Sequence, residues 1–238
     1  MIRRALIVVL LIAAAAPLML AMSQLPPHGS SETPPYTHIS PYYLEHGAEE
    51  AGAENIVTDV ILNYRGFDTQ HEVTVIFTSM AAVLAVLLLD PPGRQRAVQV
   101  QQPVPVSTVV RFIVRVLAPF IALFAIYVIL NGHVTPGGGF QGGTIIGALV
   151  IALSLVMSKE DADALLPRKA EHLLQAAAPI AFFVVGLAGL FAWGEYLYFP
   201  RDEELRWLST LMLIIIEIGI GVGGACVLIR IFRAMRAD

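Results

Sequence analysis

The chain has 238 residues, of which 56% are hydrophobic and only 14% are charged, and its formal net charge is −4. It is far more apolar than a soluble domain, and nothing basic and aromatic points to nucleic acid. The single cysteine, Cys226, excludes a disulfide framework. Runs of about 20 apolar residues recur, which predicts an all-α polytopic membrane protein.

The first element is an apolar run over residues 1–25, in which Arg3 and Arg4 precede the apolar part. A cleaved signal peptide fits the basic start and the small residues around Ala21. The run is also as long as a membrane span, so we expect a retained transmembrane anchor.

Residues 26–54 are polar, rich in proline and serine, and carry five glutamates without any lysine or arginine. This composition predicts an extended extracytoplasmic loop. The histidines at His28, His38 and His46 are spaced too irregularly for a metal motif.

Residues 55–89 begin with a short helical pattern over 55–62, expected at the membrane surface, and end in a second span. Arg65, Asp68 and Glu72 crowd the entrance to that span. One interpretation is structural: Asp68 or Thr69 caps the helix, and the arginine pairs with a carboxylate. The other assigns these charges, with Asp59, to an ion pathway.

Residues 90–105 form a proline-punctuated linker, and residues 106–238 hold the remaining spans. The four predicted spans of this last part are Thr108–Leu130, Thr144–Met157, Leu173–Trp193 and Trp207–Ile229. A charged loop is expected at 158–172 and another loop at 194–206.

Between the third and fourth spans lies a segment with six glycines and one proline, residues 131–143. Such residues interrupt a helix, and broken backbone is tolerated in lipid only where protein buries it or water reaches it. We therefore expect a packed corner between two membrane helices.

Two other motifs compete at this segment. Gly137, Gly139 and Gly142 fit G-x-G-x-x-G, with acids at Glu160 and Asp161. A dinucleotide fold needs a strand before the glycines, but a full membrane span precedes them. A phosphate-binding loop fails because no lysine precedes Thr144.

The distribution of basic residues predicts the orientation. With six spans and a cytoplasmic N-terminus, only Arg65, Arg201 and Arg206 of the 15 basic residues lie outside. Both termini are then cytoplasmic, and the glycine corner faces outward.

Glu217 lies near the middle of the sixth span, among isoleucines. A carboxylate at that depth is costly and faces the protein interior or a wet cavity. It is either a protonated structural group bonded to another helix or a relay for protons or cations. His133 poses the same choice, since its ring either exchanges protons or braces the glycine segment, and so does Gln141.

Residues 106–238 resemble the MnhB subunit of the Mrp-type (Mnh) multisubunit sodium/proton antiporters. The resemblance rests on Tyr127, on Gly132-His133-Val-Thr-Pro136-Gly137-Gly138-Gly139-Phe140-Gln141-Gly142-Gly143, and on Ile216-Glu217-Ile218-Gly219, where the family has aspartate-isoleucine-glycine. The substitution keeps the carboxylate.

Residues 55–89 are similar to the C-terminal end of the large A-type subunit of these antiporters. The same segment also occurs as the small E-type membrane subunit of membrane-bound hydrogenases. Arg65-Gly66-Phe67-Asp68-Thr69 and Glu72 carry this resemblance, and Asn63 stands where an aspartate is common. The chain thus looks like a fusion of two subunits across the 90–105 linker, and residues 26–54 lie outside both resemblances.

The resemblance implies a non-catalytic subunit of a cation (sodium)/proton antiporter in the cell membrane, with other membrane subunits, sodium ions, protons and lipid as partners. It implies no nucleic acid, cofactor, metal site or catalytic residue. The alternatives are a membrane-arm subunit of a hydrogenase or related redox complex, and a purely structural scaffold. The ion-pathway candidates are Glu217, His133, Asp59, Asp68, Glu72 and Arg65.

Overall fold

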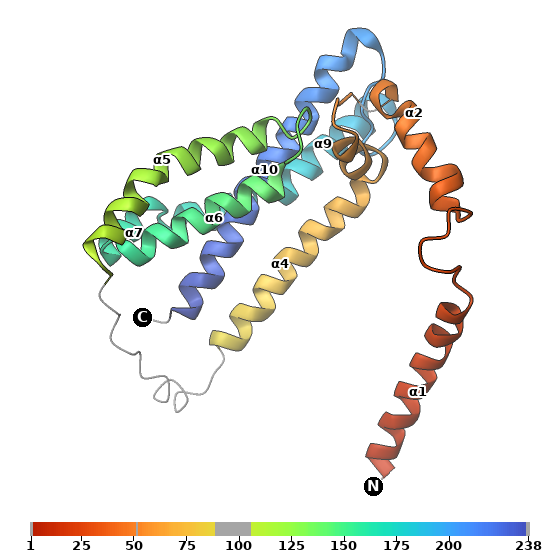
Figure 1. The fold of residues 1–238 in the computed structure, drawn as a ribbon, viewed down its shortest axis with the longest axis horizontal. Coiled ribbons are helices and arrows are strands. Elements are labelled where there is room, and N and C mark those ends of the chain that lie inside the picture. Colours follow the sequence, from red (N-terminus) through yellow and green to blue (C-terminus); the bar gives the residue numbers. More distant parts are fainter. Residues whose placement is uncertain (1, 51, 89–105, 237–238) are drawn as a thin grey trace. The chain divides into compact units, whose positions relative to one another are not determined.

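The structure is a computed structural model that describes residues 2–50, 52–88 and 106–236. Every regular element among the described residues is helical (Figure 1). The chain divides into two compact units, residues 1–45 and residues 46–238. The linker predicted at 90–105 lies outside the described residues.

The first unit consists of α1 (Ile2–Ser23), a π-helical turn η1 (Pro35–Ile39) and the start of α2 (Ser40–Glu50). The described side chains of α1 are apolar and exposed apart from its basic start, as expected of a helix that faces lipid. The extended loop predicted for 26–54 is wrong for much of its length. Pro35 begins the helical turn η1, which continues directly into α2, and helix-forming residues such as Leu44 and Glu45 extend it.

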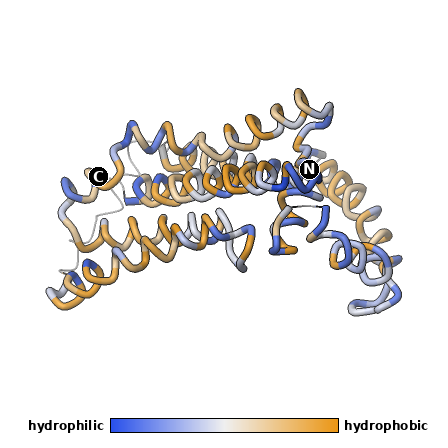
Figure 2. The backbone as a smooth tube through the Cα atoms, turned by 90° about the horizontal axis from the view of Figure 1, so that it is seen from above, coloured by the Kyte–Doolittle hydropathy of each residue, from blue (hydrophilic) through white to orange (hydrophobic). Residues whose placement is uncertain are grey.

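The second unit is a bundle of antiparallel and crossing helices. It consists of α3 (Ile56–Thr58), η2 (Asp59–Tyr64), α4 (Gly66–Leu88), α5 (Thr108–Leu130), α6 (Gly139–Val156), α7 (Lys159–Leu165), α8 (Arg168–Leu174), α9 (Ala177–Trp193), η3 (Glu203–Leu205) and α10 (Arg206–Met235). Six helical segments of the described chain are long and apolar enough to cross a membrane, which agrees with the six predicted spans. Figure 2 shows these helices as mostly hydrophobic tubes with hydrophilic ends.

Two local predictions need correction. The helix α4 begins at Gly66, before Asp68 and Thr69, so neither residue caps it. The Thr69 hydroxyl instead donates to the carbonyl of Ile61 at 2.5 Å. The region expected as a charged loop at 158–172 holds α7 and most of α8, because Ser158 caps α7 by accepting from Asp161 N at 3.2 Å.

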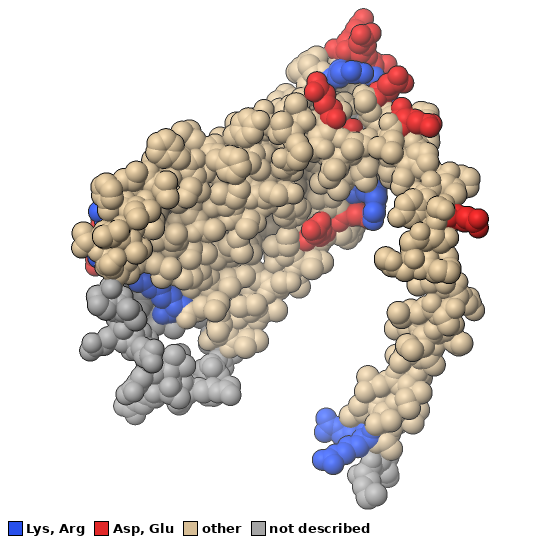
Figure 3. All heavy atoms as spheres, viewed as in Figure 1, with Lys and Arg blue, Asp and Glu red and all other residues tan. Residues whose placement is uncertain are grey.

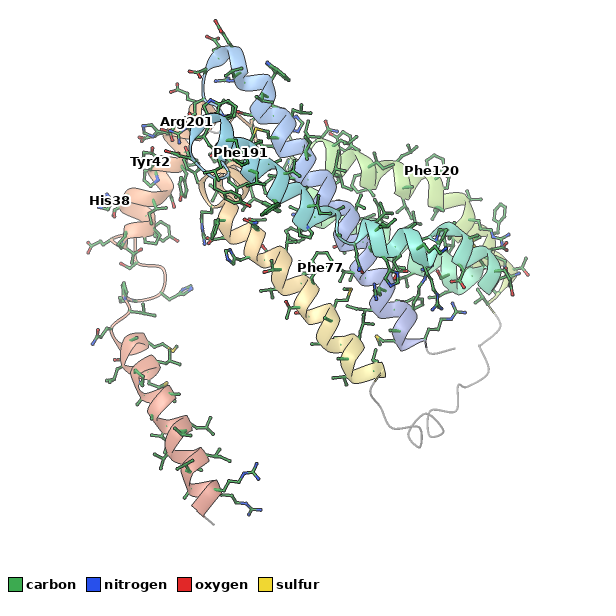
Figure 4. The ribbon with its side chains drawn as sticks, turned by 180° about the vertical axis from the view of Figure 1, so that it is seen from behind. His38, Tyr42, Phe77, Phe120, Phe191 and Arg201 are labelled. Carbon is green, nitrogen blue, oxygen red and sulfur yellow. The ribbon has the colours of Figure 1, made fainter. Side chains whose placement is uncertain are left out.

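The helix α10 lies at the centre of the bundle and packs against α4, α5, α6, α8 and α9. Small residues let its neighbours approach closely. A Cβ at Gly221 would lie 2.7 Å from Cδ1 of Ile129 on α5, and one at Gly219 would lie 2.6 Å from Cβ of Ala181 on α9. Many side chains that point away from the bundle are apolar; Phe120 of α5 is an example (Figure 4).

Three arginines near the end of α10 bind the ends of other helices. Arg233 donates to the carboxylate of Glu171 and to the carbonyl of Leu166 at 2.9 Å. Arg230 donates to Gln175 Oε1 at 2.7 Å, and Arg236 to the carbonyl of Ser154 at 3.0 Å. We call Arg230, Arg233 and Arg236 the arginine end of the bundle; it fastens α6, the end of α7 and α8 to α10.

Candidate functional site at the start of α6

A turn of eight residues, 131–138, joins α5 to α6; we call it the glycine turn. Gly137 and Gly138 have φ values of +153° and +131°, which side-chain-bearing residues rarely adopt. The amide of Gly138 donates to the carbonyl of Val128 at 3.2 Å, so the turn folds back onto the end of α5. A helix, α5, stands where a dinucleotide fold would need a strand.

The carboxylate of Glu217 lies against this turn. The side chain is 3% exposed, and its Oε2 accepts a hydrogen bond from the amide of Gly139, the first residue of α6. The first amides of a helix have no partner within it and carry a partial positive charge. The sixth span therefore places its acid at the amino end of the fourth.

Glycines leave the room that this carboxylate occupies. A Cβ at Gly138 would lie 3.0 Å from both carboxylate oxygens of Glu217, and one at Gly132 would lie 3.0 Å from Oε1. A Cβ at Gly139 would meet the main-chain carbonyl of Glu217 as well as Oε2. The glycines and Glu217 thus form one packed site.

The charge of Glu217 has no cationic partner within residues 2–50, 52–88 and 106–236. The group that donates to its carboxylate is the neutral main-chain amide of Gly139. A buried ionised carboxylate without a cation is unfavourable, so the site favours a bound proton or a bound cation.

Residues 52–58, here called the covering segment, bind the outer side of the glycine turn. Asn55 Nδ2 donates to the carbonyl of Gly132 at 2.8 Å and to that of Thr135 at 3.0 Å. The Thr58 hydroxyl donates to the same Gly132 carbonyl at 2.6 Å. Gly132 is therefore held between Thr58 on one side and Glu217 on the other.

The main chain of the covering segment adds further bonds. The amides of Glu54 and Asn55 both donate to the carbonyl of His133, at 2.9 and 3.0 Å. The hydroxyl of Thr210 on α10 lies 3.1 Å from the carbonyl of Gly52 and can donate to it. Main-chain groups of the turn that would otherwise need water are thereby paired.

Asp59 follows the covering segment directly and is fully buried, at 0% exposure. Its Oδ1 accepts from the amide of Ala53 at 3.2 Å, while Oδ2 has no partner among the described residues. Burial raises the pKa of Asp59 from 3.8 to about 7, and the hydrogen bond from Ala53 acts in the opposite direction. This carboxyl can therefore exchange a proton near neutral pH.

The His133 ring is half-buried, and its Nδ1 is buried without a partner in the described part of the chain. The His133 carbonyl, by contrast, accepts two amides of the covering segment. The structure thus brings three of the predicted ion-pathway residues, Glu217, His133 and Asp59, to the glycine turn and the segment that covers it.

The other three candidates lie on the exposed start of α4. Arg65 and Asp68 form an ion pair at 2.6 Å with side chains 59% and 61% exposed, and Glu72 is exposed one turn further on. Gln141 and Pro136 are also exposed, and Phe140 packs against the core. The structure does not join Arg65, Asp68 or Glu72 to the Glu217 site.

We did not predict from the sequence that Asn55 and Thr58 donate hydrogen bonds to the glycine turn. We also did not predict the ion pair between Glu171 and Arg233. The signal for Asn55 was available, since an asparagine before a helical pattern is a common N-cap, and its Oδ1 accepts from Val57 N at 3.1 Å. Nothing in the sequence pairs residues that lie 62 positions apart. The described residues contain no cluster of three His, Cys, Asp or Glu side chains able to hold a metal ion.

Comparison with known families adds two findings. Residues 109–228 match the family described as "Domain related to MnhB subunit of Na+/H+ antiporter". Residues 3–103 match the MbhE family, the E-type subunit of MBH, a match that includes the 26–54 region which the resemblance had left out.

Among known proteins, the chain is similar to one chain in the structure of the membrane-bound sulfane sulfur reductase, an archaeal respiratory membrane complex. The TM-score is 0.66 with 30% identity, and the match covers 99% of this chain and 98% of that one. A chain of the Mrp complex from Dietzia sp. DQ12-45-1b gives a TM-score of 0.67 and 25% identity, over 99% of this chain and only 26% of that one.

A putative antiporter subunit mnhB2 from Staphylococcus haemolyticus is 29% identical over 138 residues. These residues are 54% of this chain and 94% of the relative. A protein related to the MnhB subunit therefore also occurs as a chain of its own.

Proposed function

The chain belongs to the family of domains related to the MnhB subunit of Na+/H+ antiporters, and we propose on this basis that it is a non-catalytic subunit of a cation/proton antiporter module, with Glu217 in the ion pathway. The observation that carries the proposal is the placement of the Glu217 carboxylate at the amino end of α6. The carboxylate of the sixth span, α10, thus binds the main chain where the fourth span, α6, begins.

The energetics favour an exchangeable charge at this position. An acidic side chain near the centre of a membrane helix costs about 2.5–3.5 kcal/mol on insertion scales. The amide of Gly139 offsets part of this cost, but it brings no positive charge. A proton or a sodium ion can supply that charge and can leave again, which a fixed arginine cannot.

Two neighbouring groups extend the proposed pathway toward the solvent. Asp59 titrates near neutral pH and lies beside the segment that covers the glycine turn. His133 lies in the turn itself and has a buried ring nitrogen without a described partner. We assign the exposed acids Asp68 and Glu72, with Arg65 beside them, to the entrance.

The proposed location is the cell membrane, with both termini cytoplasmic and the glycine turn outside. Figure 3 fits a bundle that spans the membrane, since most charged side chains on the face shown lie toward its two ends, and the distribution of basic residues along the chain supports the orientation. Cysteines introduced at Ser31 and Ser158 should react with an impermeant thiol reagent from opposite sides of the membrane. Labelling from the same side would contradict the six-span orientation.

The ion-pathway proposal is tested with three substitutions at Glu217, each measured as sodium-dependent pH change in vesicles that hold the whole complex. Glu217→Gln should assemble normally and lose most transport, because glutamine keeps the hydrogen-bond acceptor but cannot ionise. Glu217→Asp should keep part of the transport. If Glu217 is a structural group of a scaffold, Glu217→Gln is silent and Glu217→Leu harms assembly instead.

A second candidate function is a membrane-arm subunit of a redox complex that contains the same antiporter module. The similarity to a chain of the sulfane sulfur reductase complex, which covers nearly the whole of both chains, favours it. Purification of the native complex separates the two candidates. Co-purifying iron–sulfur or nickel–iron subunits support the redox complex, and antiporter subunits alone support the stand-alone module.

A further inference from the structure

The covering segment and the glycine turn belong to different family matches. Residues 52–58 lie within the part that matches the MbhE family, and residues 131–138 lie within the part that matches the MnhB-related domain. The hydrogen bonds between them are therefore contacts between two parts that are not always joined in one polypeptide. The MnhB-related protein of Staphylococcus haemolyticus is such a separate chain.

The fit depends on two particular side chains. Asn55 uses its amide group to donate to the carbonyls of Gly132 and Thr135 at 2.8 and 3.0 Å, while its Oδ1 caps the helix that follows. Thr58 is 1% exposed and donates to the Gly132 carbonyl at 2.6 Å. Between them, Val57 is 58% exposed and points away.

The glycine turn supplies the complementary surface. Its carbonyls at Gly132, His133 and Thr135 all accept hydrogen bonds from the covering segment. Main-chain carbonyls that are removed from water must be paired, and leaving one unpaired is costly. A segment without the amide of Asn55 would leave the Thr135 carbonyl without its donor, and one that lacked the Thr58 hydroxyl as well would also leave the Gly132 carbonyl without its donors.

We propose that the glycine turn is a docking site for the pair formed by Asn55 and Thr58, through which the two family parts recognise one another. Where the parts are separate proteins, the same turn receives a second chain with an amide side chain at a helix start and a hydroxyl three residues later. This recognition does not depend on ion transport, so its test is independent of the role of Glu217.

The test uses the whole chain, purified in detergent, with a protease site inserted between residues 89 and 105 and an affinity tag at the C-terminus. After cleavage, the N-terminal fragment that remains on the tagged fragment is measured through successive washes. The unsubstituted chain should retain it. Asn55→Ala combined with Thr58→Val should weaken retention by about tenfold for each side-chain hydrogen bond that is lost.

Val57→Ala is the matched control and should retain the fragment as the unsubstituted chain does. The uncut variants are checked by size-exclusion chromatography, so that misfolding is not taken for loss of docking. Thr58→Ser keeps the hydroxyl and should retain the fragment, whereas Thr58→Val should lose it more readily. This comparison of single variants still tests the proposal if the double variant fails to fold. The proposal is overturned if the unsubstituted fragments separate, if the double variant retains its fragment equally well, or if serine and valine at position 58 behave alike.

Discussion

Two glutamates, Glu217 and Glu171, are each only 3% exposed, but their hydrogen-bond partners differ in charge. Glu171 on α8 binds the guanidinium of Arg233 on α10. Glu217 on α10 binds the amide of Gly139, and no cation pairs with it in the described part of the chain. The two sites are 16 residues apart along α10, about 24 Å at 1.5 Å per residue.

The comparison separates a buried carboxylate that has a fixed cationic partner from one that has none among the described residues. At the arginine end, a permanent cation cancels the carboxylate and fastens three helices to α10. At the glycine turn, the carboxylate of Glu217 has only a neutral donor, so the site favours a bound proton or a bound cation. The helix α10 thus carries Arg233, the structural partner of Glu171, near one end and the candidate transport acid Glu217 nearer the other.

The largest expected effect on stability is at the arginine end. Arg233→Ala leaves Glu171 buried and unpaired, which we expect to cost roughly 3–5 kcal/mol. Removing both charges with Arg233→Leu and Glu171→Leu should cost much less. Unfolding of the purified chain in mixed micelles measures both variants, and equal losses in the single and double variants would contradict the pairing.

Asp59 should make stability depend on pH. Because the folded state raises its pKa from 3.8 to about 7, the folded chain holds a proton that the unfolded chain has already lost over this range. The contribution of Asp59 to the free energy of unfolding is largest below about pH 4. It falls as the pH rises to about 7 and stays constant at higher pH.

The difference between low and high pH should be roughly 2–4 kcal/mol, and Asp59→Asn should abolish it. Unfolding at a series of pH values, with the variant subtracted from the unsubstituted chain, isolates this contribution. A difference that grows with rising pH would have the wrong sign for this account.

A smaller loss is expected from crowding the Glu217 site. At Gly139, a Cβ would lie 2.8 Å from Cβ of Ile220 and 3.0 Å from Glu217 Oε2, so Gly139→Ala should cost roughly 1–3 kcal/mol. Gly224→Ala is the control, because a Cβ there meets nothing within 4 Å. Thermal unfolding in detergent compares the two variants. Equal midpoint temperatures would show that the site accommodates a Cβ at Gly139 and would contradict the close packing.

The smallest effect should come from the exposed pair Arg65–Asp68. Both side chains are more than half exposed, so Arg65→Ala should change stability by roughly 0–1 kcal/mol, with added salt reducing the change further. The same unfolding measurement checks this. A loss as large as that of Arg233→Ala would mean that this pair is also structural.

The sequence was sufficient to predict the six apolar spans, and it singled out the glycine segment 131–143 and Glu217, although α6 already begins at Gly139 within that segment. Each depends on local composition: apolar run length, glycine content, or one acid among isoleucines. The contact between Glu217 and Gly139 could not be predicted, because it joins residues 78 positions apart through the packing of α6 on α10.

Other predictions failed for local reasons. Residues 40–50 were expected to be extended because they are polar, yet leucine and glutamate favour a helix there, and α2 continues directly from η1, which Pro35 begins. Residues 55–62 are helical, as their apolar pattern predicts, but that pattern shows which face is apolar and not which carbonyls Asn55 binds.

The most direct test of the central claim compares Glu217→Gln with Glu171→Gln in the whole complex. Sodium-dependent pH change is measured in vesicles and divided by the amount of assembled complex. We predict that Glu217→Gln assembles in normal amount and loses most of this specific activity, while Glu171→Gln lowers the amount and leaves the specific activity of what assembles unchanged. Full specific activity in Glu217→Gln would contradict the account.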